Sequence, residues 1–172
     1  MTVLGIDPGI ATVGFGVVNG ERGKITPVKY GAIRTDAGLA LHTRLLSIAE
    51  DMDSLISIFK PDAVAVEELF FNTNVKTAIS VAHGRGVILL TATRLGIPIY
   101  EYTPLQVKQA VVGYGRAEKK QVMELTRMLL GMNKIPKPDD AADALAIAIC
   151  HIHSAGSAMS EDKLASLIKR NG

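Results

Sequence analysis

Apolar residues in the first third of the chain form three short runs separated by turn sequences. The runs cover residues 2–6, 13–18 and 25–33, and the segments Asp7-Pro8-Gly9 and Asn19-Gly20 lie between them. Runs of this length, bounded by proline, glycine and asparagine, are typical of strands joined by tight turns. The pattern therefore predicts a meander of three antiparallel strands.

The apolar spacing changes to that of a helix from Leu39 onward. Apolar side chains recur every three or four residues as far as Phe59, and Pro61 marks the end of this pattern. The order of strands and crossovers in the remainder predicts an α/β domain with a five-stranded mixed sheet flanked by helices on both faces. Its predicted elements are a strand at 63–67, a helix from 74 or 75 to 95, a strand at 97–101, helices at 104–111 and about 117–130, and a helix from Asp140 to about His153.

Length and composition fit a single domain in a reducing compartment. The 172 residues are 48% hydrophobic, which is enough to bury a proper core, and Cys150 alone permits no internal disulfide. Residues 155–172 lack a strong apolar stripe, so we expect one folded domain over 1–154 and a flexible tail over 155–172. Since the sequence shows neither a signal peptide nor an apolar run of membrane-spanning length, we expect a cytoplasmic protein without membrane contact.

Four acids lie in apolar sequence, where a charge is costly. Asp7 ends the first strand, Glu67 ends the fourth, and Asp140 and Asp143 belong to an alanine-rich helix. Each has a structural alternative, since Asp7-Pro8-Gly9 is a good turn and Asp140 in a first helical turn is favoured by the helix dipole. Glu67 and Asp143 are harder to explain in that way, because their surroundings look buried.

The predicted topology brings these acids together. If a right-handed crossover makes the first and fourth strands parallel neighbours, their carboxyl ends lie roughly 5 Å apart. Asp140 and Asp143 are three residues apart, so they share one face of their helix. Converging carboxylates make an all-oxygen site suited to Mg²⁺ or Mn²⁺, which indicates phosphoryl-transfer chemistry.

Net charge gives little guidance about partners. The chain carries a formal charge of +2, so a nucleic-acid surface would have to be local. Lys108, Arg116, Lys119 and Lys120 lie close together in the sequence. They fit either such a surface or ordinary solvated helix faces.

Several segments, in a fixed order over residues 2 to about 153, carry a family resemblance. The segments are Gly5-Ile6-Asp7-Pro8-Gly9, Val66-Glu67-Glu68-Leu69-Phe70, Gln106-Val107-Lys108-Gln109 with Val111-Val112-Gly113, Ala117-Glu118-Lys119, and Asp140-Ala141-Ala142-Asp143-Ala144-Leu145-Ala146-Ile147-Ala148. The first of these segments is weakly specific when taken alone, but the ordered set is highly specific. In this set the chain resembles the RuvC family of bacterial Holliday junction resolvases.

This resemblance implies a ribonuclease H-like fold that works as a homodimer on four-way DNA junctions in homologous recombination and DNA repair. Each subunit would nick one of two opposed strands, leaving 5′-phosphate and 3′-hydroxyl ends. By motif match, the catalytic acids and metal ligands would be Asp7, Glu67, Asp140 and Asp143, with two Mg²⁺ ions per active site and Mn²⁺ as a possible substitute. RuvA and RuvB, the branch-migration complex, are implied as partners.

For DNA contact, the resemblance implies three further residues. Lys108 and Lys119 match basic residues that approach the DNA near the scissile phosphate. Phe70 matches an aromatic residue that stacks on a base at the crossover, and the role of Phe71 is left open.

Two other functions stay open at this point. An actin-like or sugar-kinase-like phosphotransferase also begins with an acid after a strand, but it requires a second domain for which 172 residues leave no room. A junction-binding protein without catalysis would require that an essential acid be missing.

The helix predicted to end at residue 95 contains Gly84-Arg85-Gly86. Two glycines in a helix cost roughly 1 kcal/mol each unless another backbone approaches closely there. The neighbour is either the same helix of a second subunit or the protein's own sheet.

Overall fold

The computed structural model describes residues 1–69 and 75–170, with side chains described as far as 69 and over 78–156. The elements within these residues alternate between strands and helices after an initial meander. Their bounds are β1 (Thr2–Asp7), β2 (Thr12–Glu21), β3 (Lys24–Arg34), α1 (Leu41–Phe59), β4 (Ala63–Glu67), α2 (Val75–Arg94), β5 (Ile99–Tyr102), α3 (Pro104–Val112), α4 (Lys119–Leu129) and α5 (Asp139–Arg170).

The five strands form one sheet in the order β3-β2-β1-β4-β5. β1, β2 and β3 pair antiparallel, whereas β4 is parallel to both β1 and β5. The predicted mixed sheet is therefore confirmed. The last pair of the β1–β4 ladder joins Ile6 to Val66, so the next residues, Asp7 and Glu67, end their strands side by side.

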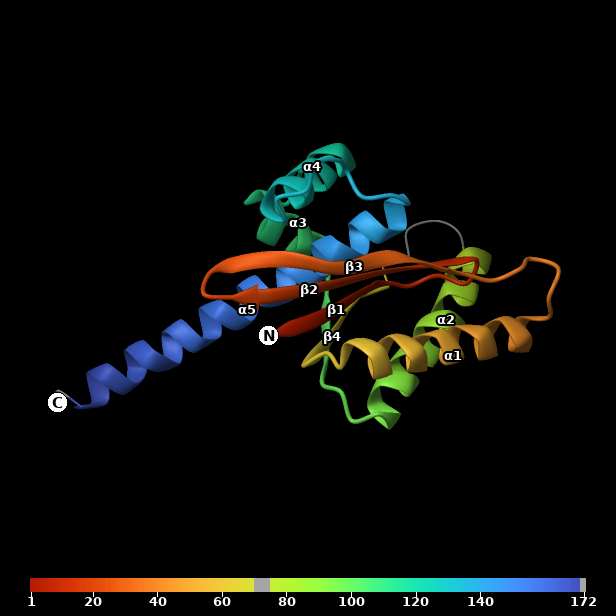
Figure 1. Ribbon diagram of the computed structural model, residues 1–172, viewed down its shortest axis with the longest axis horizontal. Coiled ribbons are helices and arrows are strands. Elements are labelled where there is room, and N and C mark those ends of the chain that lie inside the picture. Colours follow the sequence, from red (N-terminus) through yellow and green to blue (C-terminus); the bar gives the residue numbers. More distant parts are fainter. Residues whose placement is uncertain (70–74, 171–172) are drawn as a thin grey trace.

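Helices cover both faces of the sheet, as the sequence predicts (Figure 1). On one face, α1 and α2 pack on alternate strand residues such as Leu4 and Ile6, with Ile48, Met52 and Ile88 supplied by the helices. On the other face, α5 lies directly on the sheet, and α3 and α4 pack against it. Two separate apolar layers therefore hold the strand ends in place.

α5 lies so close to the sheet that several strand positions facing it leave no room for a side chain. A Cβ at Gly5 of β1 would clash with the backbone oxygen of Ala144, and one at Gly14 of β2 would clash with the backbone oxygen of Asp140. These contacts fix the first turns of α5 against β1 and β2. They set the position of the acids that the helix carries.

Gly84 on α2 makes a similar approach within the same chain. A Cβ there would clash with the backbone oxygen of Gly9, in the turn that follows β1. Packing against the protein's own sheet therefore explains Gly84. Gly86 has no such neighbour within 4 Å and is exposed, so it faces outward.

α5 is longer than its apolar pattern predicts. The helical backbone continues to Arg170 instead of ending near His153, because residues 157–170 contain good helix formers and no proline.

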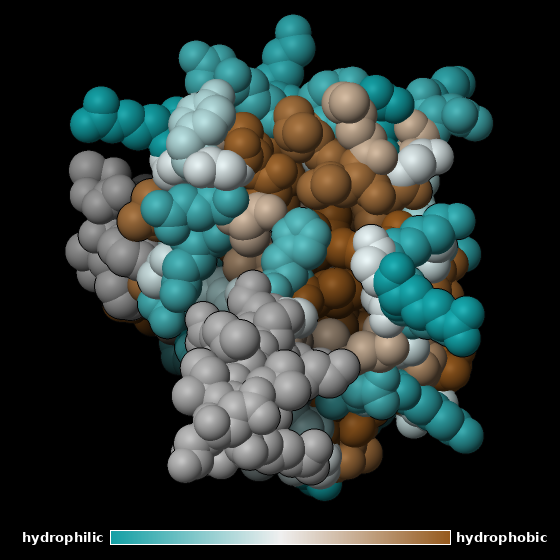
Figure 2. Space-filling view, turned by 90° about the vertical axis from the view of Figure 1, so that its left-hand side faces the viewer, coloured by the Kyte–Doolittle hydropathy of each residue, from teal (hydrophilic) through white to brown (hydrophobic). Residues whose placement is uncertain are grey.

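The end of the molecule from which α5 projects has apolar side chains at its centre and polar ones around its rim (Figure 2). Among the described residues, no helix combines the length and apolar character needed to cross a membrane.

Candidate active site

Two of the predicted acids come from neighbouring parallel strands. Asp7 is the last residue of β1 and Glu67 the last residue of β4. Each follows a run of fully buried apolar residues, and each is itself partly buried. Ligands of open α/β sheets gather at the carboxyl ends of such strands.

The other two acids come from the start of α5. Asp140 lies in the first turn of the helix, where the helix dipole favours a negative charge, and Asp143 follows one turn later. The contact between the Asp140 backbone and Gly14 places this turn beside β2, next to β1. The four acids therefore lie near one another at one edge of the sheet, on three elements.

The pKa of Asp7 records this convergence. Burial, followed by repulsion from Asp143, Glu67 and Asp140, raises the pKa of Asp7 to about 8, and Lys119 partly opposes the rise. Burial and repulsion from Asp143 also raise the pKa of Glu67. Carboxyls crowded in this way resist ionisation until a cation compensates their charge.

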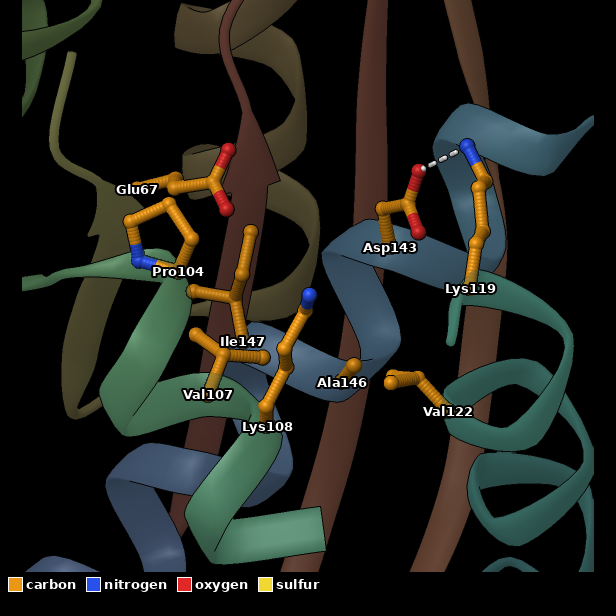
Figure 3. A pocket seen from close by; sticks show the side chains of 9 residues that line it. All are labelled: Glu67, Pro104, Val107, Lys108, Lys119, Val122, Asp143, Ala146 and Ile147. Carbon is orange, nitrogen blue, oxygen red and sulfur yellow. Dashed lines mark hydrogen bonds and ion pairs between the residues drawn. The ribbon is translucent and has the colours of Figure 1, made fainter. Parts of the chain in front are cut away.

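Two of the acids, Glu67 and Asp143, line a cleft of about 180 Å³ between α3, α4 and α5. Glu67 and Asp143 lie on opposite sides of it, and apolar side chains such as Val107 and Ile147 line the space below them (Figure 3). Lys108 rises from α3 into the same space, and Lys119 lies at the edge beside Asp143 (Figure 3). Both predicted lysines thus line the cleft that Glu67 and Asp143 border, and Lys119 alone of the two pairs with an acid there.

Lys119 is engaged with one of the acids. Its ammonium nitrogen Nζ donates to Oδ2 of Asp143 at 2.8 Å, and the two side chains are 59% and 30% exposed. This ion pair raises the pKa of Lys119, which therefore stays charged. A cation beside the carboxylates reduces their mutual repulsion.

The donor chemistry fits a hard divalent cation. All four candidate ligands are carboxylates, and burial together with repulsion from the neighbouring acids raises the pKa of Asp7 and of Glu67, a charge repulsion that such an ion would relieve. As they stand, no three His, Cys, Asp or Glu side chains in the described residues are grouped closely enough to hold an ion. Binding would therefore require the carboxylates to draw together and Asp143 to exchange Lys119 for the ion.

Arg85 is a neighbour of this site that the sequence does not identify. Its Nε donates to the backbone oxygen of Glu67 at 3.2 Å, and its guanidinium pairs with Glu101 on β5. The sequence draws attention to this segment because of Gly84 and Gly86. A charged residue between two helix glycines is the one feature that could have pointed to Arg85. Its side chain is 16% exposed.

Two other groups of residues lie apart from the acids or outside the described residues. His151 is buried and shares a hydrogen bond of 2.7 Å with the hydroxyl of Tyr102. Phe70 and Phe71 lie outside the described residues.

Sequence comparisons with known proteins identify the family of this chain. The family model "Crossover junction endodeoxyribonuclease RuvC" matches residues 3–151. A protein of that name from Syntrophomonas wolfei subsp. wolfei is 58% identical over 154 residues, covering 90% of each chain.

Solved structures agree with the sequence matches. A Thermus thermophilus RuvC structure is similar with a TM-score of 0.85 at 38% identity, over 92% of this chain and 97% of that one. T. thermophilus RuvC in complex with a Holliday junction substrate gives a TM-score of 0.84 at 36% identity, over 91% and 96% of the two chains. The ribonuclease H-like fold is thereby confirmed.

Proposed function

The chain belongs to the RuvC family of crossover junction endodeoxyribonucleases, and on this basis we propose that it resolves Holliday junctions by paired, symmetric nicks. It is a phosphodiester hydrolase of homologous recombination and DNA repair, and the nicks leave 5′-phosphate and 3′-hydroxyl ends. The observation that carries the proposal is the meeting of four carboxylates at the ends of β1 and β4 and the start of α5.

Asp7, Glu67, Asp140 and Asp143 would hold two Mg²⁺ ions, for which Mn²⁺ could substitute. When bound, such a pair activates a water molecule and stabilises the departing 3′ oxygen of an in-line displacement. The protein itself need not supply a nucleophile. Its carboxylates orient the reacting centre, and the apolar side chains beneath the cleft exclude bulk water from one side.

The lysines would act on the DNA. Lys108 extends into the cleft from α3, and Lys119 at its edge becomes available for a phosphate oxygen once Asp143 is engaged elsewhere (Figure 3). Phe70 follows Glu67 by three residues, so it belongs to the same segment of chain and would stack on a base at the crossover.

We assign the homodimer contact to the outer face of α2. Ile79 and Leu90 are 52% and 67% exposed on this helix. His83 and Gly86 are exposed between them at helical spacing, so the four residues form one stripe. A stripe with an open glycine suits close packing against the same helix of a second subunit.

The remaining assignments rest on the family and the sequence. RuvA and RuvB would deliver the junction to the dimer, and the protein would act in the cytoplasm, where its DNA substrate lies. Residues 1–154 would form the nuclease domain and 155–172 a flexible tail, so a chain ending at residue 154 should still fold and cleave.

The first test is cleavage of a synthetic mobile four-way junction with Mg²⁺, beside a linear duplex of the same sequence. Asp7→Asn removes one proposed ligand, and Asp51→Asn changes an exposed acid on α1 as the matched control. Paired, ligatable nicks in the junction that vanish only with Asp7→Asn would support the proposal. Binding of the junction by the wild-type protein without cleavage in either Mg²⁺ or Mn²⁺ would overturn it in favour of a non-catalytic junction protein.

A further inference from the structure

Arg85 ties α2 to the strand end that carries Glu67. The last pair of the β1–β4 ladder is Ile6 with Val66, so the backbone oxygen of Glu67 lies beyond that ladder. Arg85 supplies a donor to this oxygen through Nε, at 3.2 Å. The contact fixes the backbone at the residue whose side chain enters the cleft.

Arg85 is itself held in place. Its guanidinium pairs with the carboxylate of Glu101 on β5, the strand beside β4. The arginine side chain is 16% exposed, so this pair is better shielded from solvent than a typical surface ion pair. Arg85 therefore has two anchors, one on each of the adjacent strands β4 and β5.

The same turn of α2 also touches the other strand that carries an acid. Gly84 packs on the backbone oxygen of Gly9, two residues after Asp7. One turn of helix thus meets the chain just after β1 and the last residue of β4. It spans the two strand ends whose separation sets the distance between Asp7 and Glu67.

We propose that Arg85 is a positioning residue, which sets the place of Glu67 and thereby the affinity of the four acids for divalent cations. The inference rests on the proposed function, because it takes these acids to be the metal site. Arg85 acts through the backbone of Glu67. The charges that shift the pKa of the Glu67 carboxyl, among the described groups, are Asp143 and Lys119.

The same helix offers a matched control. Arg94, in the last turn of α2, pairs with Asp53 on α1 at 2.5 Å. It is also an arginine bound to a carboxylate, but Asp53 belongs to α1, and that helix carries none of the proposed ligands. Arg94→Gln therefore removes an ion pair from α2 without touching β4.

The test is calorimetric titration of the purified, DNA-free protein with Mn²⁺, with thermal unfolding in EDTA as a check on folding. Arg85→Gln should lower Mn²⁺ affinity by about tenfold or more, since partners of metal ligands typically contribute 10- to 100-fold. Arg85→Lys should restore part of the loss, because lysine keeps the charge that pairs with Glu101. Arg94→Gln should bind Mn²⁺ like the wild-type protein.

Two further variants separate the possible failures. Wild-type affinity in folded Arg85→Gln would overturn the inference. If that variant does not fold, Glu101→Gln and Arg85→Lys decide, and wild-type affinity in both would equally overturn it. Asp7→Asn reports on the site itself: if it binds Mn²⁺ normally, the proposed metal site is wrong, whatever Arg85 does.

Discussion

Replacing Asp7 by asparagine should stabilise the metal-free protein while it abolishes cleavage. Burial and repulsion from the other acids raise the pKa of Asp7 from 3.8 to about 8. A carboxyl whose pKa is higher in the folded state binds more protons there. The contribution of Asp7 to the free energy of unfolding is therefore greatest below about pH 4 and falls as the pH rises toward 8.

The size of the effect follows from that rise in pKa. At about 1.4 kcal/mol for each pH unit between 3.8 and 7, an Asp7 that keeps its proton in the folded state but loses it on unfolding costs the folded state roughly 4 kcal/mol at pH 7. Because Asp7 is only partly buried, solvent and side-chain relaxation reduce this, and an asparagine must still satisfy its amide. We expect Asp7→Asn to gain about 1 to 3 kcal/mol, or a rise in Tm of about 2 to 12 °C.

Thermal and urea unfolding in EDTA at pH 5, 7 and 8.5 would measure this gain. The difference between variant and wild type should grow with pH, and the exposed Asp51→Asn should show no such trend. Saturating Mg²⁺ should raise the Tm of the wild-type protein but not that of Asp7→Asn, since the ion binds the folded state alone. A variant less stable than wild type at pH 8.5, or a difference independent of pH, would refute the reasoning.

Three further predictions concern lysine and glycine positions. Lys119→Ala should weaken cleavage and reduce the magnitude of the slope of log K against log salt for junction binding by about 0.9. The same change should tighten Mn²⁺ binding to the DNA-free protein, because Asp143 loses its ion-pair partner. An unchanged slope would show that Lys119 does not contact phosphate. Gly14→Ala should cost more than about 2 kcal/mol in urea unfolding, because its Cβ would clash with the backbone of α5, and a stability equal to wild type would contradict this packing. Gly86→Ala should leave the free energy of unfolding of the monomer unchanged, since the added Cβ meets nothing within 4 Å, but it should weaken the dimer in sedimentation. Gly84→Ala should instead destabilise the fold. A dimer that Gly86→Ala leaves unaltered would show that this helix face is not the interface.

The sheet and the acids could be predicted because each leaves a local signal. Strand and helix periods separate clearly along the chain, and the ends of apolar strands are unusual places for Asp7 and Glu67. Parallel pairing of β1 with β4 then brings those two acids together, as the sequence predicts. Asp140 and Asp143 follow from their spacing on one helix.

Contacts that depend on how elements are oriented could not be predicted in this way. Whether Arg85 points to solvent or to Glu67 depends on the rotation of α2 about its axis. The same rotation decides that Gly84 packs against Gly9 while Gly86 faces outward. The close packing of α5 on Gly14 joins residues that are far apart in the sequence, so it exists only once the sheet has formed. The apolar pattern did not predict the full length of α5, because helix propensity without an apolar stripe continues the helix past residue 156.

The position of α5 in the chain has a consequence for protein synthesis. Asp140 and Asp143 emerge from the ribosome long after Asp7 and Glu67, and the buried residues Ala141 to Cys150 that cover one sheet face emerge with them. A nascent chain, or a fragment truncated before residue 139, lacks half of the acids and the helix that seals the sheet. With the proposed metal site incomplete, such products should not cut DNA, so we expect nuclease activity to appear only after α5 has been synthesised and has folded onto the sheet.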